Sequence, residues 1–232
     1  MKSTLDRRTM IRTMAAVAVF CAVAYVCQFV FRIHVLFLTF DAKDAVMAVG
    51  AMLFGPVWGA VMALIVSSIE AISISGTAWI GWIMNFVSSA TFVCVSAVIY
   101  RYKRTMQGAI IGLLSGALSM VCVMLLCNLL LTPIYTGMAV QDIVALIPTL
   151  LLPFNLTKAL LNAGLVFVIY KPLSIALKRA GILKGDVGTF TFDRRSVIVL
   201  VAGLTVIAAC VVVFLAILGG SIEVPSPLDK GL

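Results

Sequence analysis

Seven apolar runs, separated by short polar breaks, make up most of this sequence. Most of them are about 20 residues long, which is the length that an α-helix needs to cross the hydrocarbon core of a bilayer. The second run is shorter, and Gly55-Pro56 separates it from the third, which predicts a tight helical hairpin. We expect helices at about residues 10–31, 45–54, 58–74, 79–100, 107–131, 148–170 and 196–218.

The composition agrees with this pattern. Of the 232 residues, 63% are apolar and 11% are charged, and the mean hydropathy is +1.19. These values lie far outside those of a soluble domain. We therefore expect an all-α integral membrane protein whose first apolar run is a retained span and not a cleaved signal peptide.

The basic residues are distributed unevenly among the connections between the runs. Of the 17 lysines and arginines, four precede or begin the first span, three follow the fourth span and six follow the sixth. The positive-inside rule assigns these connections, and the N-terminus, to the cytoplasm. This clustering also explains the net charge of +8 without invoking a nucleic acid.

One apolar stretch, at residues 147–158, contains an asparagine and a lysine, Asn155 and Lys158. An ammonium group in the middle of a membrane costs roughly 3 kcal/mol on insertion scales, so such a lysine marks a functional site by default. The two residues are three positions apart and share one side of a helix. Pro148 and Pro153 predict that this helix begins here, which would add the partial positive charge of a helix N-terminus.

Other polar residues are predicted at the same outer membrane face. Asp41 and Asp44 precede the second span, Asn85 lies in the fourth and Asn128 ends the fifth. Together with Asn155 and Lys158 they predict a cavity for a ligand that carries several carbonyl acceptors. Aromatic residues that could form walls for a flat ring are Phe37, Phe40, Trp79, Tyr135 and Phe154.

A purely structural role is the alternative for each of these polar residues. Lys158 could pair with Asp41 or Glu70, and the asparagines could join helices through interhelical hydrogen bonds. Such contacts are common in membrane proteins and contribute about 0.6 kcal/mol each. Glu70 lies near the outer end of the third span, so we expect that it could also reach water.

The sequence carries no enzyme signature that we recognise. His34 has no catalytic partner at a suitable spacing, and the six cysteines are scattered through apolar segments without a CxxC pair. We therefore expect no enzymatic activity, no cofactor and no metal site. Uphill transport by this chain would need a partner ATPase or an ion gradient.

Two stretches resemble a known family. Residues 37–44 (Phe-Leu-Thr-Phe-Asp-Ala-Lys-Asp), followed by Phe-Gly-Pro at 54–56 and Gly59, resemble the F-x-x-D-x-x-D … F-G-P-x-x-G signature of S components. These are the substrate-binding subunits of energy-coupling factor (ECF) transporters. Residues 128–135 and 152–158 are similar to the riboflavin-specific branch, the RibU family. The resemblance covers about residues 10–180.

The resemblance implies a six-helix membrane subunit in the cell membrane that captures riboflavin from outside. The loop after the first helix would cover the site. Riboflavin would be the transported ligand and not a cofactor. The subunit would join a membrane coupling subunit and two cytoplasmic ATPases, and would topple in the membrane to release the vitamin inward.

The resemblance also suggests roles for particular residues. Asn155 and Lys158 match the positions at which riboflavin-type members hold the ring system, whose pyrimidine edge offers carbonyl acceptors and an imide donor. Candidates for the polyol chain, or for support of the site, are Asn85, Asn128 and Thr39. We include Phe40, Asp41 and Tyr135 among the expected substrate-binding residues. Ala18 and Ala22 match the AxxxA motif with which the first helix of the family docks the coupling subunit; an ordinary contact within the chain is the alternative.

The seventh apolar run is not required by a six-helix family. We expect an S-component domain at residues 1–180, a basic cytoplasmic linker at 181–195, and an added transmembrane helix with a short external tail at 196–232. Two other functions stay open on the sequence: an S component for another vitamin or precursor, and a helical membrane scaffold without a transport role.

Overall fold

A computed structural model describes residues 2–35, 38–73, 78–182 and 194–218 of the chain. Helices form almost all of this part, and the exception is one short hairpin of two strands. The elements in chain order are α1 (Lys2–Val30), β1 (Ile33–Val35), β2 (Leu38–Phe40), α2 (Lys43–Phe54), α3 (Pro56–Ser73), α4 (Ala78–Tyr102), α5 (Met106–Thr136), α6 (Val140–Leu146), a π-helical turn (Ile147–Leu151), α7 (Leu152–Arg179) and α8 (Arg194–Leu218).

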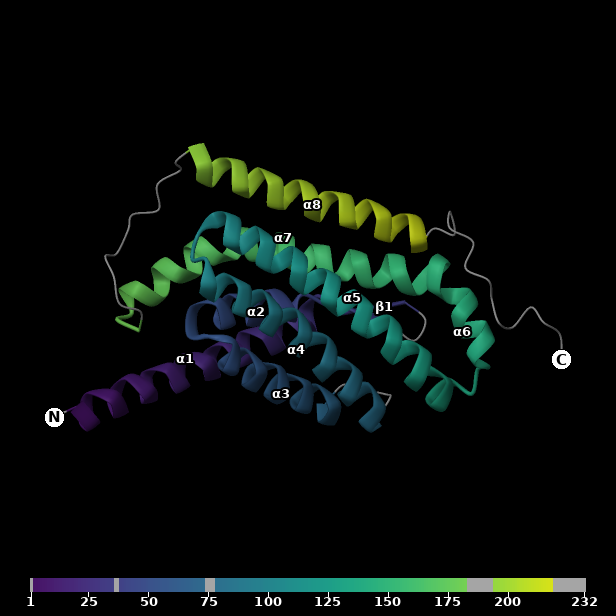
Figure 1. The fold of residues 1–232 in the computed structure, drawn as a ribbon, viewed down its shortest axis with the longest axis horizontal. Helices are drawn as coiled ribbons and strands as arrows, with labels where there is room; N and C mark the ends of the chain where they lie inside the picture. Colours follow the sequence, from purple (N-terminus) through teal and green to yellow (C-terminus); the bar gives the residue numbers. More distant parts are fainter. Residues whose placement is uncertain (1, 36–37, 74–77, 183–193, 219–232) are drawn as a thin grey trace.

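Five helical segments among the described residues are long and apolar enough to cross a bilayer. They are Thr9–Val30, Pro56–Ser73, Trp79–Tyr102, Met106–Thr136 and Val140–Arg179. The N-terminus, the C-terminal end of α7 and the beginning of α8 lie at the left of Figure 1, and α6 lies at the right. The expected all-α membrane fold is thus confirmed, with α8 as a helix added to the bundle.

Helix α2 is only 12 residues long, yet it forms the centre of the bundle. Every residue from Lys43 to Met52 is buried, because α2 packs against α1, α3, α4 and α7. A helix that is apolar on all sides is expected in such a position. Gly55, at a φ of 108°, separates α2 from α3 and allows the predicted hairpin.

The connection after α1 forms a small antiparallel hairpin. Ile33 pairs with Phe40, His34 with Thr39 and Val35 with Leu38. The short, partly apolar run in the sequence predicts only a loop here. Leu38 and Phe40 on β2 are buried, so the hairpin lies against the bundle.

Two expected helix ends are wrong. Helix α5 continues through Pro133 to Thr136 and ends at Gly137, whose φ of 71° is left-handed. The chain from Val140 to Arg179 is helical throughout, so Pro148 and Pro153 do not begin a helix. The site therefore receives no partial positive charge from a free helix N-terminus. Membrane helices tolerate proline because neighbouring groups satisfy the freed backbone.

Helix α8 packs closely along α7 (Figure 1). A Cβ atom added to Gly203 would lie 3.0 Å from the carbonyl oxygen of Gly164, and one added to Gly164 would lie 3.2 Å from that of Gly203. Small residues of this kind let two helices approach each other in lipid. The predicted linker at 181–195 lies largely outside the described residues, as does the tail after residue 218.

Candidate functional site

A small polar cavity lies between the hairpin and helices α4, α5 and α7. Its volume is about 70 Å³. The hairpin covers it with Leu38 and Thr39 of β2. The other residues that line it are Gly81, Met84, Asn85, Ser88, Met124, Tyr135, Phe154, Asn155 and Lys158.

Lys158 places its ammonium group at the wall of this cavity. Its Nζ lies 2.8 Å from Oδ2 of Asp41 and 3.1 Å from the backbone oxygen of Thr39. These two contacts join α7 to the end of the hairpin, 117 and 119 residues away in sequence. An ammonium has three donors, so one N–H group is left for a ligand.

Asn155 lies one turn before Lys158 on α7 and is buried. Its Nδ2 donates to the backbone oxygen of Leu151 at 2.8 Å, which fixes the orientation of the amide. The amide oxygen and the second N–H group are then available to a ligand in the cavity. Lys158 and Asn155 thus offer both donors and an acceptor from one side of α7.

Asp41 is held by two lysines. Its Oδ2 lies 2.8 Å from Nζ of Lys158 and 3.9 Å from Nζ of Lys43. Burial opposes the charged form of the carboxyl group, but the two ammonium groups outweigh it and hold the pKa of Asp41 below its ordinary value. The two ammonium groups therefore favour the charged form of Asp41, which orients Lys158.

Further buried charged side chains lie away from the cavity, inside the bundle. Lys43 on α2 forms an ion pair with Glu70 on α3, and both side chains are only 1% exposed. Asp44 accepts a hydrogen bond from the hydroxyl of Ser89 on α4. The expectation that Glu70 could reach water is wrong, because its side chain is buried in the ion pair with α2.

The cavity brings together five of the eight expected substrate-binding residues: Thr39, Asn85, Tyr135, Asn155 and Lys158. The other three are not among the residues that line it. Phe40 stacks edge to face on Phe154, with 6.0 Å between ring centres. Asp41 holds Lys158 from behind, and Asn128 is fully buried and bonded to Met124 and Thr132 on its own helix.

The expected aromatic walls are only partly in place. Tyr135 and Phe154 line the cavity, whereas Trp79 is 61% exposed near the beginning of α4. Phe37 lies outside the described residues. The pairing of Lys158 with Asp41, which was the structural alternative, is present, but it leaves Lys158 at the cavity wall.

Asn162 is a residue of the site region that the sequence did not reveal. Its Oδ1 accepts from the backbone N–H of Ala45 at 2.8 Å, and its Nδ2 donates to the backbone oxygens of Asp41 at 3.1 Å and Lys158 at 3.0 Å. It therefore joins α7 to the beginning of α2 just behind the site. The signal that could have found it is its position four residues after Lys158, on the same side of the helix.

The alanines of α1 divide between two faces of the helix. Ala16 and Ala24 are buried against the bundle, whereas Ala18 and Ala22 are exposed. An ordinary contact within the chain therefore does not explain the Ala18–Ala22 spacing. The exposed pair leaves a smooth strip on which a second helix could pack closely.

Comparisons with known proteins agree with this architecture. Residues 12–172 match the family described as the substrate-specific component of ECF transporters. The chain belongs to this family of S components. A curated relative is the riboflavin transporter RibU of Staphylococcus aureus (strain TCH60), which is 28% identical over 178 residues, covering 72% of this chain and 93% of the relative.

A solved structure of the S component of a bacterial ECF transporter has the same fold. It has a TM-score of 0.61 and 25% sequence identity, and the match covers 75% of this chain and 99% of that one. The family is a substrate-binding part of a membrane transporter, so a scaffold without a transport role is not favoured. The region that matches the family ends before α8, which is an addition in this S component.

Proposed function

We propose that this S component captures riboflavin outside the cell and delivers it to an ATP-driven uptake complex. The observation that carries the proposal is the polar cavity in which Lys158 and Asn155 face Thr39, Asn85 and Tyr135. The pyrimidine edge of a flavin displays two carbonyl oxygens and one imide N–H. An ammonium and an amide on one helix side match that pattern of acceptors and donor. The similarity to the riboflavin transporter RibU supports the same ligand.

The cavity must widen before a vitamin can enter. Its volume is about 70 Å³, whereas pockets for small molecules measure roughly 300–1,000 Å³. The hairpin β1–β2 covers the cavity and is held to α7 through the contacts of Lys158 with Thr39 and Asp41. We infer that outward movement of this hairpin admits riboflavin, and that these contacts close it again.

The remaining partners follow from the family. The chain would act without enzymatic activity, cofactor or metal of its own, with riboflavin as cargo. A membrane coupling subunit and two cytoplasmic ATPases would supply the energy. The N-terminus of this multi-pass cell-membrane protein would lie in the cytoplasm, which the clustering of basic residues in the sequence supports through the positive-inside rule. Residues 1–180 would form the transport unit, with 181–195 as a basic cytoplasmic linker and 196–232 as the added helix with an external tail.

Purified protein tests the substrate directly. We expect bound yellow colour, or quenching of the fluorescence of added riboflavin on titration. Colourless protein that leaves riboflavin fluorescence unchanged, but binds another vitamin, would identify an S component for that other substrate. Protein that binds no vitamin at all would contradict the proposal.

Docking of the coupling subunit is expected to depend on Ala18. The change Ala18→Leu should abolish riboflavin uptake by proteoliposomes that contain the whole complex, because the larger side chain holds the facing helix away. Riboflavin binding by the isolated subunit should be unchanged, since Ala18 is exposed. Val19→Leu, on an exposed neighbouring position without the small-residue spacing, is the matched control. Loss of binding in Ala18→Leu would instead make this strip a packing face of the chain itself.

A further inference from the structure

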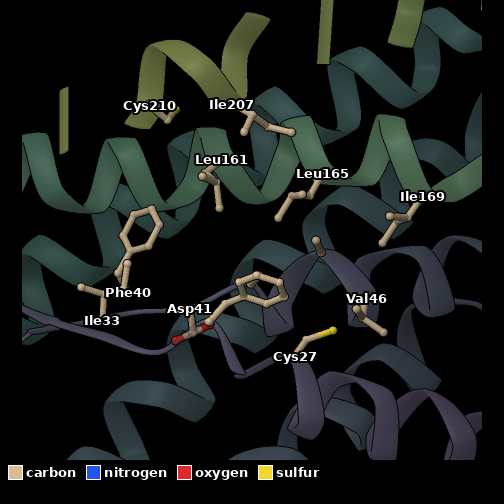
Figure 2. A pocket seen from close by; sticks show the side chains of 13 residues that line it. Cys27, Ile33, Phe40, Asp41, Val46, Leu161, Leu165, Ile169, Ile207 and Cys210 are labelled. Carbon is tan, nitrogen blue, oxygen red and sulfur yellow. The ribbon is translucent and has the colours of Figure 1, made fainter. Parts of the chain in front are cut away.

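A second, larger cavity lies between α1, α2, α7 and α8. Figure 2 shows Leu161, Leu165 and Ile169 of α7 on one wall, with Ile207 and Cys210 of α8 beyond them. Cys27 of α1 and Val46 of α2 form the opposite wall. The cavity volume is about 630 Å³, nine times that of the polar cavity.

This cavity is unsuited to the vitamin. Asp41 is the only charged residue among the described residues that line it, and the others are apolar or cysteine. One oxygen of Asp41 is taken by Lys158, which lines the other cavity. The ion pair thus lies between the two cavities. A polar ring system placed on the apolar side would meet only one polar side chain, Asp41, whose Oδ1 has no hydrogen-bond partner among the described residues, and would lose most of its hydrogen bonds to water.

An apolar space of this size needs an apolar occupant. Protein interiors are close-packed, and empty apolar cavities reduce stability in proportion to their volume. The walls on α1 and α7 belong to segments that are long and apolar enough to cross a bilayer. The medium next to this cavity is therefore hydrocarbon, and a lipid acyl chain is the occupant that this medium supplies.

A polar group outside this apolar lining belongs to Arg32, which is not itself one of the lining residues. It stands between Phe31 and Ile33, which both line the cavity, just after the end of the span Thr9–Val30. Its Nε and Nη1 are buried and have no hydrogen-bond partner within the described part of the chain. Unpaired guanidinium donors are costly when buried, and a phosphate oxygen satisfies such a donor through a charge-assisted hydrogen bond. The end of a membrane span, where Arg32 stands in the chain, is also the depth at which lipid phosphate groups lie.

We propose that the apolar cavity holds one acyl chain of a membrane phospholipid whose phosphate group is bound by Arg32. The lipid would support the hairpin and Asp41 from the side opposite to the vitamin. Ile207 and Cys210 complete the cavity from α8, which lies beyond the region that matches the family. The proposal thus gives the added helix a role, as the outer wall of a lipid site.

Photocrosslinking tests the site in the intact protein. The protein is reconstituted in nanodiscs that contain a phospholipid with a diazirine in its acyl chain, and the adducts are mapped by mass spectrometry. We expect adducts to concentrate on Leu161, Leu165 and Ile207. Leu204 of α8 and Leu130 of α5 are 50% and 70% exposed and report contact with bulk lipid.

Two variants identify the contributions of head group and chain. Arg32→Gln should reduce the cavity adducts roughly tenfold, which is the effect of losing one charge-assisted hydrogen-bonded contact. Leu165→Trp should remove them by filling the cavity. Arg101→Gln, an exposed arginine at the end of α4, is the matched control and should change nothing. Circular dichroism and the elution profile check that each variant is folded.

Three outcomes would contradict the lipid site or its head group. Adducts spread evenly over Leu204, Leu130 and the cavity residues would overturn the proposal, because no lipid would then be held. Cavity adducts that persist at full yield in Arg32→Gln would overturn the binding of phosphate. Equal labelling by a photoreactive fatty acid without a phosphate would do the same.

Discussion

Replacing Lys158 with alanine is expected to weaken riboflavin binding by roughly ten- to a hundred-fold. The ammonium already donates to Asp41 and Thr39, and its third N–H group is the charged donor nearest the cavity. A hydrogen bond from a charged group contributes about 1.5–3 kcal/mol, and each 1.4 kcal/mol is about a tenfold change in affinity. Titration of riboflavin fluorescence measures the change.

The same substitution also leaves Asp41 with a single cation, Lys43, 3.9 Å away. Lys158→Ala is therefore expected to lower stability as well, and loss of binding alone would not identify a direct contact. The double variant Lys158→Met with Asp41→Asn removes both charges and should recover most of the stability, because no unpaired charge stays buried.

The double variant separates the two roles of Lys158. If Lys158 touches the vitamin, the affinity stays low after stability has recovered. If affinity and stability recover together, Lys158 is a structural residue that only holds the hairpin in place. Asn85→Leu is a second probe of the cavity that breaks no ion pair, and it should weaken binding without unpairing a charge.

The helices could be predicted from the sequence because the length of an apolar run is a robust signal in a membrane. The ends of the helices were harder to predict where a proline lies near the expected end. Pro133, Pro148 and Pro153 all lie within continuous helical chain. In water a proline commonly ends a helix, but in a bilayer the helix continues because the alternative is an unsatisfied backbone in lipid.

The polar cavity could be predicted because its most telling residues lie three apart on a single helix. Asn155 and Lys158 needed no tertiary information beyond the helix itself. The partner of Lys158 remained open between Asp41 and Glu70, since the sequence does not show which helices are adjacent. In the structure, Asp41 forms an ion pair with Lys158, and Glu70 forms one with Lys43. Lys43 could not be recognised as a buried partner because it stands among charges that are typical of a loop.

The packing of α1 shows the same limit. Its alanines predict a surface that another helix can approach, but periodicity alone does not say which helix. Ala16 and Ala24 face the bundle, and Ala18 and Ala22 face outward. Only the position of α1 against α2 and α3 separates the internal contact from the candidate docking strip.

Replacing Glu70 with alanine is expected to destabilise the protein by about 3–5 kcal/mol, the usual effect of removing one partner from a buried ion pair. Lys43 and Glu70 are each 1% exposed, so the remaining ammonium could not reach water. Asp41 would be its nearest carboxylate at 3.9 Å, and Asp41 is already engaged by Lys158. Unfolding by titration with SDS measures the change in the free energy of unfolding.

A compensating change distinguishes a buried charge from lost packing. Lys43→Met with Glu70→Leu replaces the pair by apolar side chains of similar size and should restore most of the stability. Arg101→Gln, at an exposed position, should change the free energy of unfolding by less than about 0.5 kcal/mol. A double variant no more stable than Glu70→Ala would mean that shape, and not charge, dominates here. Lys43 also lies close to Asp41, so Glu70→Ala should weaken riboflavin binding as well. The double variant removes Lys43, and it should bind riboflavin well only if Lys158 alone is enough to hold Asp41.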